Sequence, residues 1–188
     1  MVLAPVAFAI SAFSVAAIIS GINLKGSSKD KTTAKTLGII VTLAGLAIFI
    51  SSLLLIITTP YGTVYPAANV ELMFSLLMLI FSFVWITFGM TLLYNWDMKF
   101  IGDMTMVLFV FNLIAIIALF FWNSGYAVYS LVDFIIVEIT LISYLFDEVG
   151  FFALTHGKMK AGLQSGFLIA SGVLSILLAV TASGIIPL

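Results

Sequence analysis

The sequence predicts an all-α integral membrane protein with six transmembrane helices and both termini outside the cell. The first observation behind this prediction is composition: the chain is 63% hydrophobic and only 8% charged, whereas a soluble domain carries roughly 25% charged residues. The second is length, because 188 residues divided among six spans give about 31 each, little more than the roughly 20 that cross a bilayer core. Residues 1–188 are therefore predicted to form a single transmembrane domain.

The third observation is the placement of basic residues. All seven are lysines, and they lie only in the first, third and fifth of the five gaps between hydrophobic blocks. Basic residues beside a span are retained on the cytoplasmic side of a membrane, so alternate gaps are predicted to face the cytoplasm. The lysines of the three gaps are, in order, Lys25, Lys29, Lys31 and Lys35; then Lys99; then Lys158 and Lys160.

The first three spans are expected at about 3–22, 37–58 and 70–94. The third carries a face of small and polar residues from Glu71 to Gly89 that includes Trp85, which indicates either helix packing or a pathway wall. The first carries small residues at helical spacing, and such a face lets a neighbouring backbone approach closely in lipid. Its members are Ala7, Ser11, Ser14, Ile18 and Gly21.

The fourth span, about 103–122, contains one amide, Asn112, and the fifth, about 126–146, concentrates the polar side chains. Asp147 and Glu148 follow the predicted inner end of the fifth span and are interpreted as interfacial charges. At 100° per residue, five residues in and just after this span lie within about 60° of one direction. They are Asp133, Thr140, Tyr144, Asp147 and Glu148.

Glu138 lies near the centre of the fifth span, about 140° around the helix from Asp133. An ionisable group at membrane depth costs at least ~2.5–3.5 kcal/mol on insertion scales, so it should face a cavity or a partner. One of the two carboxylates is therefore expected to border a pathway and the other to bind a neighbouring helix. For Glu138, a pathway role and a hydrogen bond to Asn112 or a serine remain alternatives.

The sixth span, about 163–182, places Gln164, Ser171 and Ser175 on one face. Together with the polar groups of the earlier spans, it completes a set of residues predicted to line a solute pathway. That set is Glu138, Asp133, Thr140, Tyr144, Asn112, Trp85 and Ser171.

The polar inventory argues against several classes of function. The absence of cysteine excludes thiolate metal sites and disulfides, and no catalytic or metal-ligand constellation indicates an enzyme, a metal or a cofactor. A formal charge of −1 argues against a nucleic-acid partner, and no basic residue lies within a span to hold an anion. A small neutral solute fits this inventory better.

Three stretches resemble the small six-helix urea and short-chain amide channel family (AmiS/UreI type). They are Ser20-Gly21-Ile22-Asn23-Leu24 with the loop to Ala34; Phe81 to Gly89 with Trp96-Asp97; and Gly166 to Gly172. The chain departs from the family at Ser171, where a glutamate is typical, and in having no tryptophan in the fifth span. The resemblance implies passive conduction of urea or short amides through each protomer of a homo-oligomeric ring in the cell membrane.

Two alternatives to a channel stay open. One is a proton-coupled carrier of small carboxylates; Ala4-Pro5 faintly resembles the asparagine–proline signature of the acetate uptake family, but the asparagine is missing. That family also places basic residues after its even-numbered helices, opposite to the pattern here. The other is an accessory membrane subunit of a larger complex, in which the acids of the fifth span serve assembly.

The topology can be tested by labelling single cysteines, because the native chain contains none. Ser28→Cys and Gly157→Cys should react only with reagent on the cytoplasmic side, and Gly62→Cys only with reagent outside, because the lysine-bearing gaps face inward. An impermeant maleimide applied to intact cells and to inverted vesicles measures this. Labelling of Ser28→Cys from outside would overturn the topology.

Overall fold

The computed structural model describes residues 4–26, 31–58, 67–126 and 131–183. Within these ranges the chain is helical and contains no strand, which agrees with the predicted all-α class. At 1.5 Å per residue the helices are about 33 to 44 Å long, enough to cross a hydrocarbon core of about 30 Å. They are α1 (Ala4–Gly26), α2 (Lys31–Thr58), α3 (Ala67–Tyr94), α4 (Met98–Tyr126), α5 (Leu131–Thr155) and α6 (Ala161–Ala182).

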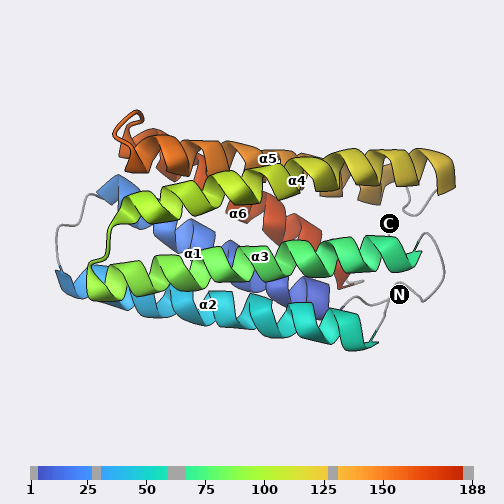
Figure 1. Cartoon of the computed structure of the whole chain (residues 1–188), viewed down its shortest axis with the longest axis horizontal. Coiled ribbons are helices and arrows are strands. Elements are labelled where there is room, and N and C mark those ends of the chain that lie inside the picture. Colours follow the sequence, from blue (N-terminus) through green and yellow to red (C-terminus); the bar gives the residue numbers. More distant parts are fainter. Residues whose placement is uncertain (1–3, 27–30, 59–66, 127–130, 184–188) are drawn as a thin grey trace.

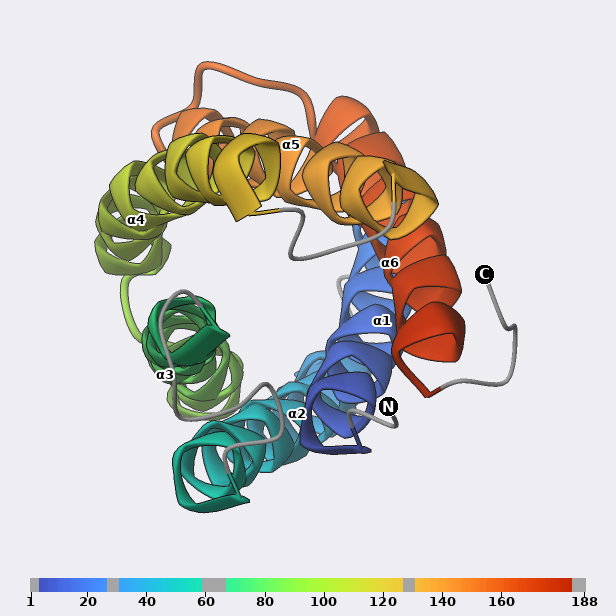
Figure 2. The same cartoon turned by 90° about the vertical axis from the view of Figure 1, so that its right-hand side faces the viewer.

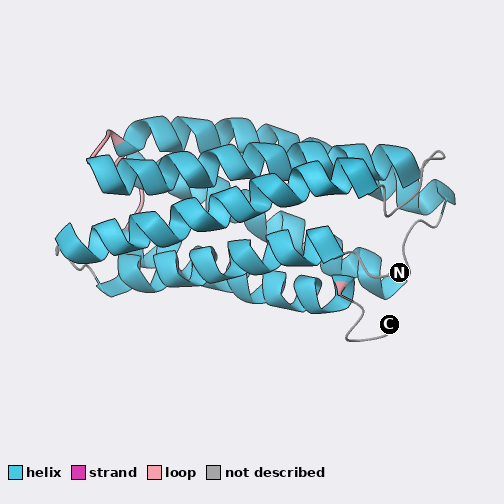
Figure 3. Ribbon diagram, turned by 90° about the horizontal axis from the view of Figure 1, so that it is seen from below, coloured by secondary structure: helices cyan, strands magenta, loops and turns pink. Residues whose placement is uncertain are grey.

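The helices form a closed ring in chain order. Each packs against its neighbours in sequence, and α6 returns to pack against α1, as the view along the bundle shows (Figure 2). Neighbouring helices run in opposite directions, and the bundle is elongated along their common axis (Figures 1 and 3). The interior of the ring is therefore bordered by helices that are far apart in sequence.

The described lysines all lie at one end of this bundle, which we call the lysine end (Figure 1). Here α1, α3 and α5 finish and α2, α4 and α6 begin, so the three lysine-bearing gaps come together. Helix α1 begins, and helix α6 ends, at the opposite end of the bundle. The predicted clustering of the basic gaps on one side is confirmed, while their orientation in a membrane stays a prediction.

Two short connections at the lysine end use residues that accept a left-handed backbone. Asn95, in the turn from α3 to α4, has φ 55°, and Gly157, after α5, has φ 71°, as is typical of asparagine and glycine. The carboxylate of Asp97 accepts a hydrogen bond from the backbone N–H of Lys99 at 2.9 Å. Asp97 therefore caps the first turn of α4.

The outer surface of the ring is apolar, as expected for a membrane protein. Large hydrophobic side chains are exposed on the helices, whereas serines, threonines and carboxylates are buried between them. Five stretches are long and apolar enough to cross a membrane: Pro5–Lys25, Thr32–Thr58, Ala68–Tyr94, Met98–Trp122 and Ala161–Ala182. Helix α5 differs from these stretches in carrying Glu138, Asp147 and Glu148 in addition to Asp133.

The fifth helix is displaced from its predicted position. It occupies Leu131–Thr155 instead of 126–146, and α4 continues to Tyr126 through residues that were expected to form an outer gap. The prediction ended the span at 146 because Asp147 and Glu148 lower the local hydropathy. Neither residue breaks a helix, so the backbone hydrogen bonding continues past them.

Close helix contacts depend on glycine and serine. Between α1 and α6, the Oγ of Ser165 in α6 donates a hydrogen bond to the carbonyl of Gly21 in α1 at 2.6 Å. This contact confirms the prediction that a neighbouring helix packs closely against the small-residue face of α1. Between α2 and α3, the Oγ of Ser52 donates to the carbonyl of Ser75 at 2.8 Å, and the Oγ of Ser75 donates back at 2.9 Å. These contacts satisfy hydroxyl groups that lipid cannot solvate.

Gly89 is predicted to set the spacing of α2 and α3. A Cβ atom there would lie 2.6 Å from the carbonyl oxygen of Gly38 and 2.7 Å from the backbone nitrogen of Thr42, so Gly89→Ala should destabilise the protein by roughly 1–3 kcal/mol. At Gly166 an added Cβ meets nothing within 4 Å. The matched Gly166→Ala should therefore cost nothing in packing, and the better helix propensity of alanine should stabilise the protein by roughly 0.5–1 kcal/mol. Unfolding in detergent measures both, and equal stabilities would contradict the packing argument.

Candidate functional site

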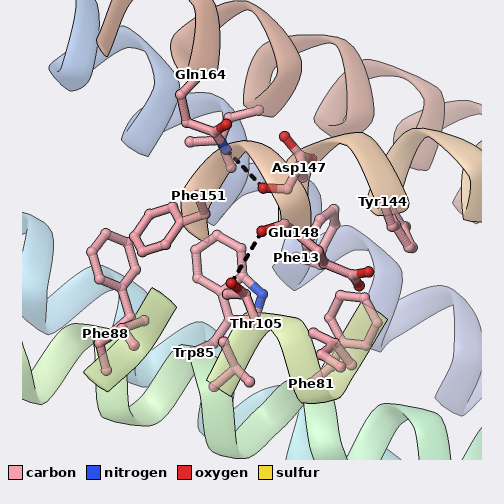
Figure 4. Close-up of a pocket in the computed structure, with 14 residues that line it drawn as sticks. Phe13, Phe81, Trp85, Phe88, Thr105, Tyr144, Asp147, Glu148, Phe151 and Gln164 are labelled. Carbon is pink, nitrogen blue, oxygen red and sulfur yellow. Dashed lines mark hydrogen bonds between the residues drawn. The ribbon is translucent and has the colours of Figure 1, made fainter. Parts of the chain in front are cut away.

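A pocket lies inside the bundle, between its middle and the lysine end. Its cavity volume, measured as the space open to the centres of water-sized molecules, is about 50 Å³. A single enclosed water needs roughly 10–15 Å³ on the same measure. Residues of α1, α3, α4, α5 and α6 line it (Figure 4). They are Phe13; Phe81, Val84, Trp85 and Phe88; Ile101, Thr105 and Leu108; Tyr144, Asp147, Glu148 and Phe151; and Gln164 and Leu168.

Aromatic rings form one wall of the pocket and close it toward the middle of the bundle. Phe13, Phe81 and Tyr144, here called the aromatic triad, have ring centroids separated by 4.8 to 5.8 Å. These distances are within the normal range for packed rings, so the triad fills the interior near the middle of α3 and α5. Beyond it the wall continues through Trp85 and Phe88, whose centroids are 5.9 Å apart.

The polar wall is organised around Asp147 and Glu148, which are adjacent in α5. The Nε2 of Gln164 donates to the carbonyl of Asp147 at 3.1 Å (Figure 4). The Oγ1 of Thr105 shares its hydrogen between the carbonyl of Gly102 at 2.7 Å and that of Glu148 at 3.1 Å. The Nδ2 of Asn112 donates to the Oε1 of Glu148 at 2.9 Å. Helices α4 and α6 thus hold this turn of α5 from two sides.

Gly150 makes room for the amide that bonds to Asp147. A Cβ atom at Gly150 would collide with the Oε1 of Gln164, so the side chain of Gln164 lies directly against the backbone of α5. Tyr144 is fixed differently: its hydroxyl lies 2.6 Å from the Oγ of Ser175, which itself donates to the carbonyl of Ser171 at 2.7 Å. The tyrosine hydroxyl is therefore the donor, and its ring stays in the aromatic triad.

Several buried oxygens of the polar wall have no hydrogen-bond partner. They are both carboxylate oxygens of Asp147, the Oε2 of Glu148, the Oε1 of Gln164 and the Oδ1 of Asn112. Ser171 faces Asp147 from α6, but its hydroxyl hydrogen goes to the carbonyl of Leu168 at 3.2 Å. An unpaired buried acceptor costs about 1–3 kcal/mol, so a hydrogen-bond donor that reached these oxygens would stabilise the site.

The structure brings some predicted pathway residues together and separates others. Trp85 and Tyr144 line the pocket, and Asn112 adjoins it through Glu148. Thr140 and Ser171 are fully buried outside the pocket lining, with each hydroxyl bonded to a carbonyl of its own helix. The face from Glu71 to Gly89 serves two purposes, because Ser75 and Gly89 pack against α2 while Trp85 borders the pocket.

Of the two carboxylates singled out at membrane depth, Glu138 does not mark the pocket. Glu138 is half-buried and lies outside the pocket lining, and the side chain of Asp133 is outside the described residues. The amide of Asn112 pairs with Glu148 and not with Glu138. The alternative that paired Glu138 with Asn112 is therefore wrong, because Glu148 takes that place.

The interpretation of Asp147 and Glu148 as interfacial charges is wrong. Their side chains are only 8% and 4% exposed, and both line the pocket. The error follows from ending the fifth span at 146, which placed both acids outside the membrane. Their position on the same helical stripe as Tyr144 was the sequence signal that pointed to the interior. Thr105 carried no comparable signal, because single polar residues near helix ends are common. Gln164 was recognised as part of the polar face of the sixth span but not as a pocket residue.

Comparison of the chain with protein-family models, with curated proteins and with solved structures finds no match. Among the residues that the structure describes, no group of three histidines and acids could hold a metal ion. The site is described by its lining, which consists of aromatic rings and residues with buried hydrogen-bond acceptors.

The contact between Asn112 and Glu148 is predicted to contribute to stability. Asn112→Ala leaves the Oε1 of Glu148 without a donor and should lower the free energy of unfolding by about 1–3 kcal/mol. Asn23→Ala is the matched control, because its Nδ2 bonds only to Ile19 in its own helix at 2.8 Å. Combined with Glu148→Ala, Asn112→Ala should show a coupling of about 0.5–3 kcal/mol. Strict additivity in detergent unfolding would contradict a direct contact.

Proposed function

We propose that this chain is a six-span membrane channel that carries small neutral solutes, such as urea or short-chain amides, across the cell membrane. The observation that supports this function best is the pocket inside the bundle, where aromatic walls meet buried hydrogen-bond acceptors. Both termini lie outside in this proposal, and α5 crosses the membrane together with the other five helices. As in the family that the sequence resembles, the protomers would pack in a ring.

The surface of α5 supports its assignment as a span. Its exposed large side chains recur at helical spacing along one face, which also carries the half-buried Glu138 at its edge. The acids Asp147 and Glu148 are buried on the opposite side. A carboxylate at membrane depth is tolerated when it faces the interior of a bundle. The exposed residues of this face are Ile135, Ile139, Ile142, Phe146 and Val149.

The pocket suits a small planar amide. The flat face of such a solute can lie against aromatic rings, and its N–H groups can donate to the unpaired oxygens of Asp147, Glu148 and Gln164. The departure of this sequence from the urea and amide channel family at Ser171 also has a structural counterpart. Asp147 lies beside Ser171, so α5 supplies the acid that the resemblance would place on α6.

A proton-coupled carrier is the second candidate, and the two buried carboxyls in the pocket are the observation that favours it. Carboxylic acids inside a bundle are typical of proton relays in transporters. A channel and a carrier differ in their response to a proton gradient, since only the carrier couples solute movement to it. An accessory subunit would move no solute alone.

Proteoliposomes containing only this protein test the three candidates. Swelling in urea, acetamide, acetate and water, followed by light scattering, should show permeation of urea and acetamide that is independent of a proton gradient. Acetate uptake driven by the gradient would favour the carrier. The absence of any flux, together with co-purification of other proteins, would favour the accessory subunit and contradict the proposal.

The pocket acids, and not Glu138, are predicted to control this flux. Glu148→Gln keeps the shape of the side chain but changes one acceptor oxygen into a donor, and it should reduce urea permeation about tenfold, equivalent to roughly 1.4 kcal/mol. Glu138→Gln, the same substitution on the same helix outside the pocket lining, should leave permeation close to wild type. A larger loss in Glu138→Gln, at equal protein levels, would place the pathway elsewhere.

A further inference from the structure

The unpaired polar atoms of the pocket share one property: all are acceptors. Asp147, Glu148 and Gln164 present unpaired oxygens and line the same cavity. The amide nitrogen of Gln164, the one side-chain donor of these three, is already bonded to the carbonyl of Asp147. A ligand that fits this wall must therefore bring several hydrogen-bond donors of its own.

The pocket also contains two carboxyl groups with no basic side chain to pair with them. None of the residues lining the pocket is basic, the chain has no arginine, and its lysines flank the hydrophobic blocks. Two carboxylates in a buried site are costly to keep ionised without a positive partner. A cation that enters the pocket would supply that partner.

The aromatic wall favours the same kind of ligand. Six aromatic side chains line the pocket, and the face of an aromatic ring attracts a cation. A guanidinium group is planar, stacks on aromatic rings and directs its N–H groups in a fixed fork toward carboxylates. A guanidinium group is also small enough for this cavity, in which the space open to the centres of water-sized molecules is about 50 Å³.

From these observations we propose that the pocket binds a small planar organic cation of the guanidinium or amidinium class. The carboxylates of Asp147 and Glu148 and the amide oxygen of Gln164 accept its N–H groups, and the rings of Trp85 and Phe88 border it. Binding requires the pocket but not passage of a solute through the bundle. The inference therefore goes beyond the proposed function and can hold without it.

Calorimetric titration of the purified full chain in detergent tests the inference, with guanidinium chloride at millimolar concentrations as the probe. Urea has the same shape without the charge, and tetramethylammonium has the charge without N–H donors. Guanidinium should bind saturably and at least about tenfold more tightly than either. Equal binding of urea, equal binding of tetramethylammonium, or no saturable binding of guanidinium would each overturn the inference.

Single-charge variants locate the site. Asp147→Asn and Glu148→Gln should each weaken guanidinium binding about tenfold or more, because each removes one buried charge that faces the ligand. Asp103→Asn is the matched control, since the side chain of Asp103 is 63% exposed near the lysine end. Unchanged binding in both pocket variants would overturn the site.

If a variant does not fold, the comparison of the three ligands on the wild-type chain still decides the question. Failure of urea flux in proteoliposomes bears on the channel and leaves this binding result untouched.

Discussion

The structure depends on one constraint: lipid cannot solvate a polar side chain, so the interior of the bundle must. The outer faces of the helices are accordingly covered with leucine, isoleucine, valine and phenylalanine, and the buried positions hold serines, threonines, an asparagine, a glutamine and carboxylates. The helices cannot associate by excluding water from apolar faces, because lipid tails are equally apolar. Close backbone approach at Gly21 and Gly89, and hydroxyl bonds such as that between Ser52 and Ser75, take over this role.

Helix α5 shows how far this constraint reaches. Its polar side chains would be unfavourable in an isolated span, yet the ring places α5 between α4 and α6, which bring donors to its backbone and to Glu148. The same contacts leave other oxygens of Asp147, Glu148 and Gln164 without partners. The contacts that hold α5 and the unpaired oxygens of the proposed binding site therefore belong to the same turn of one helix.

The pocket is asymmetric along the bundle. It lies on the lysine side of the aromatic triad, and the packed rings of Phe13, Phe81 and Tyr144 separate it from the opposite half. Movement of a solute through the whole bundle would require these rings to part. Three helices contribute them, so a small change in the positions of α1, α3 and α5 would change the width at this level.

The sequence by itself determined the class of the fold and the end of the bundle at which the lysines gather. Those properties follow from composition and from hydrophobic blocks of helical length, which act locally along the chain. The sequence also predicted the small-residue face of α1 and the importance of Trp85, Tyr144 and Asn112 within the interior. Hydropathy misplaced the end of α5, because two acids lower the average without breaking the helix.

Only the tertiary structure decided which polar groups meet. Periodicity gives the direction of a side chain about its own helix but not the rotation of that helix relative to its neighbours. The sequence analysis therefore offered Glu138 as a partner of Asn112, whereas packing of α5 between α4 and α6 brought Glu148 to it. Gln164 reaches the pocket because α6 packs beside Gly150, where the absence of a Cβ atom leaves room for its amide. These pairings depend on contacts between distant segments, which no local pattern specifies.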